Sequence, residues 1–173
     1  PGEIDLELDL SQTTLKSIPK NTGGMWISIE NTSRVINRVF IDGKSHPAFK
    51  DQVVILPNLS EKKHRLRVVL GADRLQRPRL TYISKKMPHI AENGDDLEFR
   101  VETKSRARFS FNCPPEYLLV NADGQERAVS GKNMLHGYVT SDRDISLRKL
   151  RAGTVSVIRT NMRLVSATGS DQT

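Results

Sequence analysis

Residues 3–10 read Glu3-Ile4-Asp5-Leu6-Glu7-Leu8-Asp9-Leu10, so an acidic and an aliphatic residue alternate at every step. A period of two places all the carboxylates on one face of an extended strand and all the aliphatic side chains on the other. A helix would distribute the same residues around its whole circumference. The chain is therefore expected to begin with a half-buried β-strand that has an acidic outer face.

The same pattern recurs along the chain between turn signals, and no segment sustains a helical period. About twelve strands are predicted after this first one, which makes the fold class all-β. After the first strand they are expected at residues 25–29, 34–41, 52–56, 64–71, 79–84, 97–102, 106–111, 117–120, 125–129, 134–140, 145–150 and 154–158.

Four turns are predicted to join neighbouring strands into hairpins. The clearest is Asp42-Gly43, because both residue types tolerate the positive φ that a tight turn needs. Further hairpins are expected around residues 104–105, 122–124 and 151–153.

Residues 85–96 are the best candidate for a domain boundary, because they lack periodicity and contain Pro88 and Gly94. With the division placed at residue 92, the prediction is an immunoglobulin-like β-sandwich domain over 1–91 and a second β-rich domain over 92–165. A disordered polar tail is expected over 166–173. The architecture would be two tandem small antiparallel sandwich or barrel-like domains, and the alternative is a single jelly-roll-like sandwich.

Composition gives a net charge of +7 and a pI near 9.8. This excess favours an anionic partner, such as nucleic acid, an acidic polysaccharide or a lipid surface. The single cysteine, Cys113, excludes an intramolecular disulfide. Cys113 ends an apolar alternation and Trp26 lies within an apolar strand, so both side chains are predicted to be buried.

Positive charge is densest between residues 62 and 86. The residues predicted to bind a partner are Lys62, Lys63, Arg65, Arg67, Arg74, Arg77 and Arg79. They would share one face if strands 64–71 and 79–84 were neighbours. The alternative is that the acidic strand supplies the counter-charge, for instance to Arg65 and Arg67. A second basic group comprises Arg148, Lys149 and Arg151, which could instead protect a sheet edge from aggregation.

No motif indicates catalysis, a metal or a small-molecule cofactor. The four histidines are not at metal-ligand spacing. Two serine-x-x-lysine strings, at 17–20 and 60–63, fall in predicted turns rather than on a helix. Glycines do not cluster as a phosphate-binding loop requires. The chain is therefore predicted not to be an enzyme.

The motif Phe40-Ile41-Asp42-Gly43-Lys44, followed by Leu56-Pro57-Asn58-Leu59-Ser60 and the alternating strand 64–70, resembles immunoglobulin-like and PEGA-like β-sandwich modules of cell-envelope proteins. The similarity covers residues 25–71. Glu61-Lys62-Lys63 stands where these modules usually have a glycine. The resemblance implies a non-catalytic spacer or adhesion role and assigns no functional residue.

The leading hypothesis is a non-enzymatic binding or scaffold module that contacts another protein or an anionic polymer through its basic strands. The start at Pro1-Gly2 indicates a fragment of a larger envelope or surface protein. Its expected location is extracytoplasmic, either periplasmic or on the cell surface, with any membrane anchor outside the fragment. The alternatives are a nucleic-acid-binding β-barrel and a structural, capsid-like shell subunit.

Overall fold

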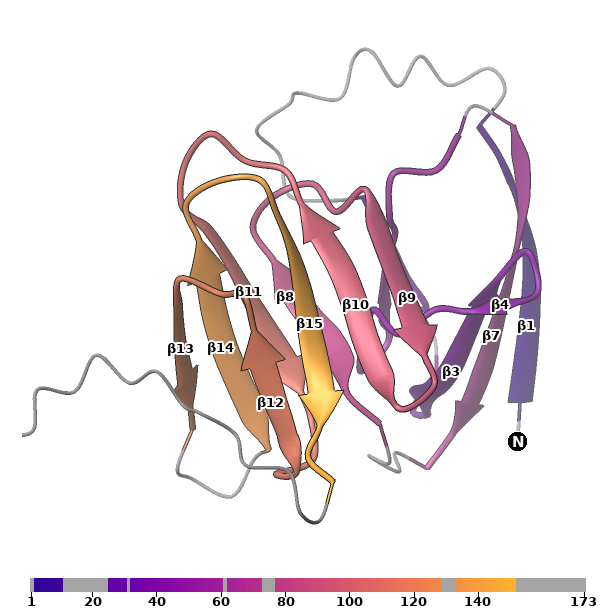
Figure 1. Cartoon of the computed structure of the whole chain (residues 1–173). Coiled ribbons are helices and arrows are strands. Elements are labelled where there is room, and N and C mark those ends of the chain that lie inside the picture. The colour runs from indigo at the N-terminus through magenta and orange to yellow at the C-terminus, as the bar shows by residue number, and fades with distance from the viewer. Residues whose placement is uncertain are drawn as a thin grey trace, which may run out of the picture.

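The computed structural model describes residues 2–10, 25–30, 32–60, 62–72, 77–128 and 133–151. All regular structure in these ranges is β, which confirms the all-β prediction (Figure 1). None of these residues forms a helix that is long and apolar enough to cross a membrane. The strands are β1 Gly2–Asp9, β2 Trp26–Ser28, β3 Val35–Ile41, β4 Lys44–Ser45, β5 Phe49–Lys50, β6 Val53–Ile55, β7 Lys63–Gly71, β8 Arg79–Ile83, β9 His89–Asn93, β10 Asp96–Val101, β11 Ala107–Asn112, β12 Tyr117–Val120, β13 Gly124–Arg127, β14 Met134–Val139 and β15 Arg143–Lys149.

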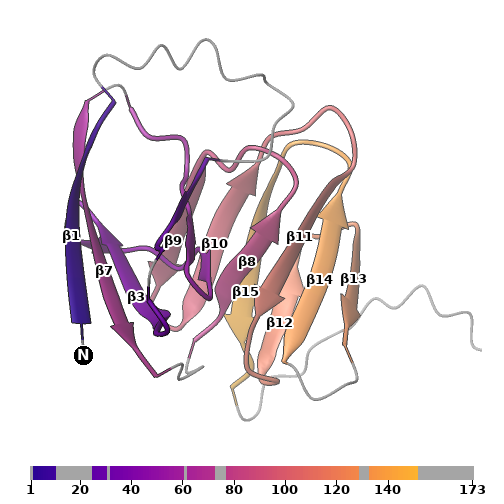
Figure 2. The ribbon, with the colours of Figure 1, turned by 180° about the vertical axis from the view of Figure 1, so that it is seen from behind.

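These strands form four small antiparallel sheets. Sheet A has the order β1-β7-β3-β4, and sheet B has the order β2-β6-β5. Sheet C has the order β13-β14-β11-β8, and sheet D has the order β12-β15-β10-β9. The sheets are arranged like the four blades of a propeller, with β1 and β13 at opposite ends of the molecule (Figures 1 and 2). The predicted architecture of two tandem sandwiches is therefore wrong, and so is the single jelly roll.

Apolar side chains fill the space between neighbouring sheets. Between sheets A and B, β3 and β7 contribute buried residues such as Val39 and Val68. Between sheets C and D, Phe99 of β10 packs on Phe109 and Phe111 of β11. The apolar cluster between sheets C and D also contains Ala48 and Ile55, which lie much earlier in the chain. Ala48 forms a parallel bridge with Leu80, so the apolar interior continues from sheet B into sheet C.

The predicted division at residue 92 falls inside β9. Residues 94 and 95 are the turn of a hairpin in which Asn93 of β9 pairs with Asp96 of β10. Gly94 has a φ of 63° there, a conformation that favours glycine. β8 also precedes the predicted division, yet it pairs with β11 on the other side of it. The irregular sequence of residues 85–96 thus corresponds to a short strand and a tight turn.

The Asp42-Gly43 hairpin is confirmed, with φ values of 50° and 78° at its two central residues and β3 paired with β4. The hairpins predicted around residues 104–105 and 122–124 are wrong. β10 and β12 belong to sheet D, whereas the strands that follow them, β11 and β13, belong to sheet C. Both connections therefore cross from one face of the shared core to the other. The tail and all but residue 151 of the predicted last turn lie outside the described residues.

Candidate functional site

The described members of the predicted basic patch are divided between two sheets. Its members Lys63, Arg65 and Arg67 lie on β7 in sheet A, and Lys62 is exposed just before that strand. Arg79 is the first residue of β8 in sheet C, and Arg77 lies two residues before it. β7 and β8 belong to different sheets, so the condition for a shared face is not met. Arg74 lies outside the described residues.

The acidic first strand pairs with the basic strand, as the alternative interpretation predicted. β1 and β7 are antiparallel neighbours, and the ion pairs form between their outer faces. They join Lys63 Nζ to Glu7 Oε1 at 2.7 Å, Arg65 Nε to Asp5 Oδ1 at 3.6 Å and Arg67 Nη2 to Glu3 Oε2 at 2.5 Å. The hydrogen bond from Lys63 to Glu7 raises the pKa of the lysine, which keeps it charged. Little unbalanced positive charge remains on this face.

A charge exchange tests this ladder. The double variant Asp5→Lys/Glu7→Lys is expected to unfold at a lower urea concentration than the parent, because two cross-strand ion pairs become repulsive. Adding Lys63→Glu and Arg65→Glu should restore most of the loss. Urea unfolding at low and high salt measures both effects, and high salt should shrink them.

The control for this exchange is Glu98→Lys, which changes an exposed carboxylate on β10 in another sheet. It should alter stability by less than about 0.5 kcal/mol. If the fourfold variant were no more stable than the double variant, the ion pairs would not contribute to strand pairing.

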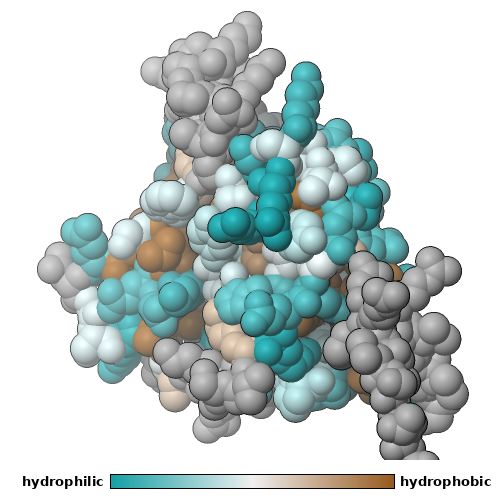
Figure 3. Space-filling view, turned by 90° about the vertical axis from the view of Figure 1, so that its left-hand side faces the viewer, coloured by the Kyte–Doolittle hydropathy of each residue, from teal (hydrophilic) through white to brown (hydrophobic). Residues whose placement is uncertain are grey.

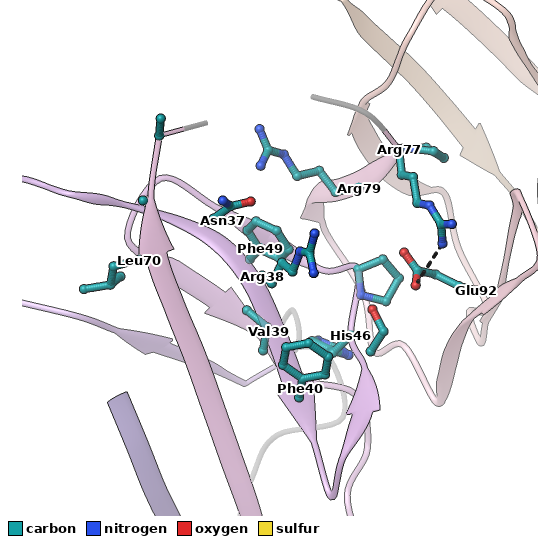
Figure 4. Close-up of a pocket in the computed structure, with 15 residues that line it drawn as sticks. Asn37, Arg38, Val39, Phe40, His46, Phe49, Leu70, Arg77, Arg79 and Glu92 are labelled. Atoms are coloured by element: carbon teal, nitrogen blue, oxygen red, sulfur yellow. Dashed lines mark ion pairs between the residues drawn. The ribbon is translucent and has the colours of Figure 1, made fainter. Parts of the chain in front are cut away.

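A cleft opens where β3 and the end of β7 approach the segment that leads into β8 (Figure 4). Its volume is about 770 Å³. We call it the arginine cleft, because three arginines and one acidic residue supply its formal charges. Its lining includes Asn37, Arg38, His46, Phe49, Gly71, Arg77, Arg79 and Glu92. Among these lining residues the cations therefore outnumber the single carboxylate of Glu92.

A β-bulge places Arg38 in the cleft. Ile36 pairs with Leu70 and Arg38 pairs with Val69, so Asn37 is an extra residue in β3. Such a bulge redirects the side chains next to it. The Arg38 side chain is exposed in the cleft and has no ion-pair partner among the described residues.

The other two arginines are held by neighbours from different sheets. Arg79 is only 8% exposed, and its guanidinium lies over the ring of Phe49 from β5, 5.1 Å from the ring centroid. Arg77 is half-exposed and pairs with Glu92 of β9 at 3.8 Å (Figure 4). These contacts hold the two guanidinium groups at the wall of the cleft.

His46 forms part of the lining but is not suited to proton transfer. It is 4% exposed, and its Nε2 lies 2.6 Å from the carbonyl oxygen of Ile55. Burial lowers its pKa, which favours the neutral ring at neutral pH. The Nε2–H of the neutral ring therefore donates to the Ile55 carbonyl, and His46 supports the cleft without adding charge.

The second basic group is dispersed along the end of β15. Lys149 pairs with Asp95 at 3.7 Å, and its backbone N–H donates to Asp96 Oδ1. Arg148 and Arg151 are exposed. Because β15 lies inside sheet D, between β12 and β10, these residues do not protect a sheet edge.

Ser60, His64 and Asp42 have the connectivity of a hydrolytic triad, but the distances favour a structural role. His64 Nδ1 lies 2.7 Å from Asp42 Oδ2. Its Nε2 lies 3.1 Å from the Ser60 carbonyl oxygen and 3.4 Å from Ser60 Oγ. The distance from Nε2 to Ser60 Oγ is longer than an ordinary hydrogen bond, and His64 is only 5% exposed. The backbone N–H of Arg65 also donates to Asp42, which lowers the pKa of that carboxyl, so the group closes the Asp42-Gly43 turn onto β7.

Two predictions for single side chains have opposite outcomes. Cys113 is fully buried, as predicted, and burial raises the pKa of its thiol. Trp26 is 64% exposed, so the prediction that it is buried is wrong. The alternation itself carries the signal, because Met25, Ile27 and Ile29 point inward and leave Trp26 on the outer face.

Arg38 is the residue of the cleft that the sequence analysis missed. The adjacent polar residues Asn37 and Arg38 interrupt the alternation of strand 34–41, and such an interruption is typical of a bulge. In the described ranges, no three histidine, cysteine or acidic residues are grouped as a metal site would need. Comparison with protein-family models, curated proteins and solved structures found no match to this chain.

Proposed function

We propose that this chain is a non-enzymatic binding or scaffold module that recognises an acidic group of a protein or an anionic polymer at the arginine cleft. The observation that carries the proposal is the distribution of charge. The acidic strand β1 neutralises Lys63, Arg65 and Arg67, whereas Arg38 in the arginine cleft has no ion-pair partner among the described residues.

The chemistry of the cleft suits a carboxylate, sulfate or phosphate group. Guanidinium groups bind such oxyanions through paired N–H donors and stay charged at any physiological pH. Arg79 is stacked on Phe49 and Arg77 is paired with Glu92, so both are partly ordered before a ligand arrives. Because these two side chains are ordered before binding, less conformational entropy is lost when a ligand binds.

The proposed location is extracytoplasmic, within a larger envelope or surface protein. It rests on the resemblance of residues 25–71 to envelope modules. In such a setting the arginine cleft would hold an acidic side chain of a partner protein or a charged group of a surface polymer.

The variant Arg38→Glu tests the cleft, with fluorescently labelled polyglutamate and heparin as the probes. We expect its affinity to fall about tenfold or more, because a hydrogen bond to a charged group contributes about 1.5–3 kcal/mol. Fluorescence anisotropy at low salt measures the affinity. The variant should fold normally, since Arg38 is exposed on its strand.

The matched control is Arg148→Glu, which makes the same change of charge at an exposed residue of the second basic group. Its affinity should stay within about twofold of the parent's, the difference being a long-range effect of net charge. Equal losses in the two variants would show that net charge alone attracts the probes, and the cleft would then not be the site.

A further inference from the structure

The outer face of sheet C carries a groove of about 520 Å³. We call it the sheet C groove, and it shares no lining residue with the arginine cleft. The end of the molecule at which β13 lies is mostly hydrophilic, with small apolar patches between the polar side chains (Figure 3). The groove is lined by Tyr82, Arg106, Arg108, Phe109, Ser110, Gly124, Gln125, Glu126, His136, Gly137 and Tyr138.

Four of these residues form a row across the sheet. Ser110 of β11 pairs directly with Tyr82 of β8 and with His136 of β14, and His136 pairs with Glu126 of β13. A hydrogen bond of 2.7 Å joins Ser110 Oγ to His136 Nδ1. Tyr82 is 51% exposed, at the open end of this row. Its ring is therefore available to a ligand that lies across the strands.

A second row lies two residues further along the strands. Tyr138 pairs with Arg108 on one side and with Gly124 on the other. A Cβ atom at Gly124 would lie 2.4 Å from Tyr138 Cε1, so the missing side chain leaves room for the ring above the sheet. The Arg106 guanidinium carbon lies over the same ring, 3.8 Å from its centroid. Arg106 is exposed, so Tyr138 supports a guanidinium group that solvent can reach.

The groove therefore has two flat stacking surfaces, the Tyr82 ring and the Arg106 guanidinium. They lie about 12 Å apart, because β8 and β14 are two strand spacings of about 4.8 Å apart and the two rows are offset by two residues, which is about 7 Å. Arg108, Ser110 and His136 lie between them. Nucleobases stack on aromatic rings and guanidinium planes, and cations between the stacked bases contact the phosphates.

We propose that the sheet C groove binds single-stranded nucleic acid, with bases stacked on Tyr82 and Arg106 and a phosphate held by Arg108. The arrangement favours single-stranded nucleic acid over a charged polymer without bases, because such a polymer would make no use of the two stacking surfaces. The inference does not rest on the arginine cleft, because the two surfaces are separate.

Two probes of equal length and charge separate base stacking from charge. One is a labelled oligothymidylate, and the other is the same sugar-phosphate chain without bases. We expect the parent protein to bind the oligothymidylate at least about fivefold more tightly at low salt, because stacking on one base contributes about 1–3 kcal/mol. Tyr82→Ala should weaken oligothymidylate binding about 5- to 150-fold and leave binding of the abasic chain unchanged.

Three further variants complete the test. Tyr82→Phe should keep the affinity, because it keeps the ring. Trp26→Ala, which removes an exposed aromatic residue on sheet B outside the groove, should have no effect. Arg108→Ala should reduce the slope of log affinity against log salt by about 0.7, the value for one phosphate contact on a single strand.

The proposal is wrong if the oligothymidylate does not bind at low salt, if both probes bind equally, or if Tyr82→Ala behaves like Trp26→Ala. Equal binding of heparin with the same dependence on Tyr82 would indicate a site for acidic polysaccharide instead. None of these outcomes bears on the arginine cleft, which is tested by Arg38→Glu with polyglutamate, a probe that has no bases.

Discussion

The variant Phe99→Ala is expected to lose about 3–5 kcal/mol of unfolding free energy, because truncating a buried phenylalanine leaves a cavity. Phe99 is 1% exposed and lies on β10 of sheet D. Its ring makes edge contacts with Phe109 and Phe111 of sheet C, both at 5.2 Å between centroids. Such contacts add about 0.5–1.5 kcal/mol to the burial of area. Phe99 therefore connects the two sheets more directly than a residue that packs within one sheet.

Urea unfolding followed by far-ultraviolet circular dichroism measures this loss. Domains of this size are usually stable by about 5–15 kcal/mol, so a large part of the stability would disappear. Phe99→Leu keeps most of the apolar volume and should cost roughly half as much or less. The exposed control, Tyr82→Ala, should change stability by about 0.5 kcal/mol or less. A Phe99→Ala loss below about 1 kcal/mol would show that sheets C and D do not depend on this contact.

The second large effect is expected at Gly137 of β14, where Gly137→Ala should destabilise the fold by about 1–3 kcal/mol. Gly137 faces the core, and a Cβ there would lie 2.4 Å from Phe109 Cε2 and 2.8 Å from Leu119 Cδ2. Both neighbours are buried, so the strand or the Phe109 ring must shift. Alanine at an unstrained strand position normally stabilises relative to glycine, so a loss would come from this overlap.

A double-mutant cycle identifies the source of that loss. Phe109→Leu removes the ring edge that overlaps the new Cβ, so Gly137→Ala should cost less in its presence, by about 0.5–3 kcal/mol of coupling. Gly71→Ala is the matched control, because its Cβ would approach only the flexible Asn37 side chain, at 3.4 Å. Strictly additive effects of Gly137→Ala and Phe109→Leu would exclude the overlap as the cause.

The alternation of polar and apolar residues predicted which side chains face the core. Leu66 and Val68 of β7 are fully buried, whereas Arg65 and Arg67 between them are exposed. The pairing of β1 with β7 was also foreseeable as an alternative, because complementary charges alternate on both strands. The faces follow from the period of each strand alone, and the pairing follows from complementary charges that can be read on the two strands separately.

The two candidate binding surfaces could not be predicted in this way, because each combines residues that are distant in the sequence. The arginine cleft needs the bulge that redirects Arg38, the cation–π contact from Arg79 to Phe49, and the pair of Arg77 with Glu92. The sheet C groove needs β8 beside β11. The predicted patch followed density of charge along the chain, and that density does not report which cations have acidic neighbours.

The all-β class, the inward and outward faces of the strands and the Asp42-Gly43 turn follow from the amino-acid pattern alone, because backbone period and local φ preferences set them. Which sheet each strand joins depends on contacts between distant parts of the chain. β10 and β11 bury the same kind of face whether they pair with each other or pack from opposite sides of one core. The alternation of polar and apolar residues is identical in the two arrangements, so long-range packing selects between them. This selection also sets where the arginine cleft and the sheet C groove lie.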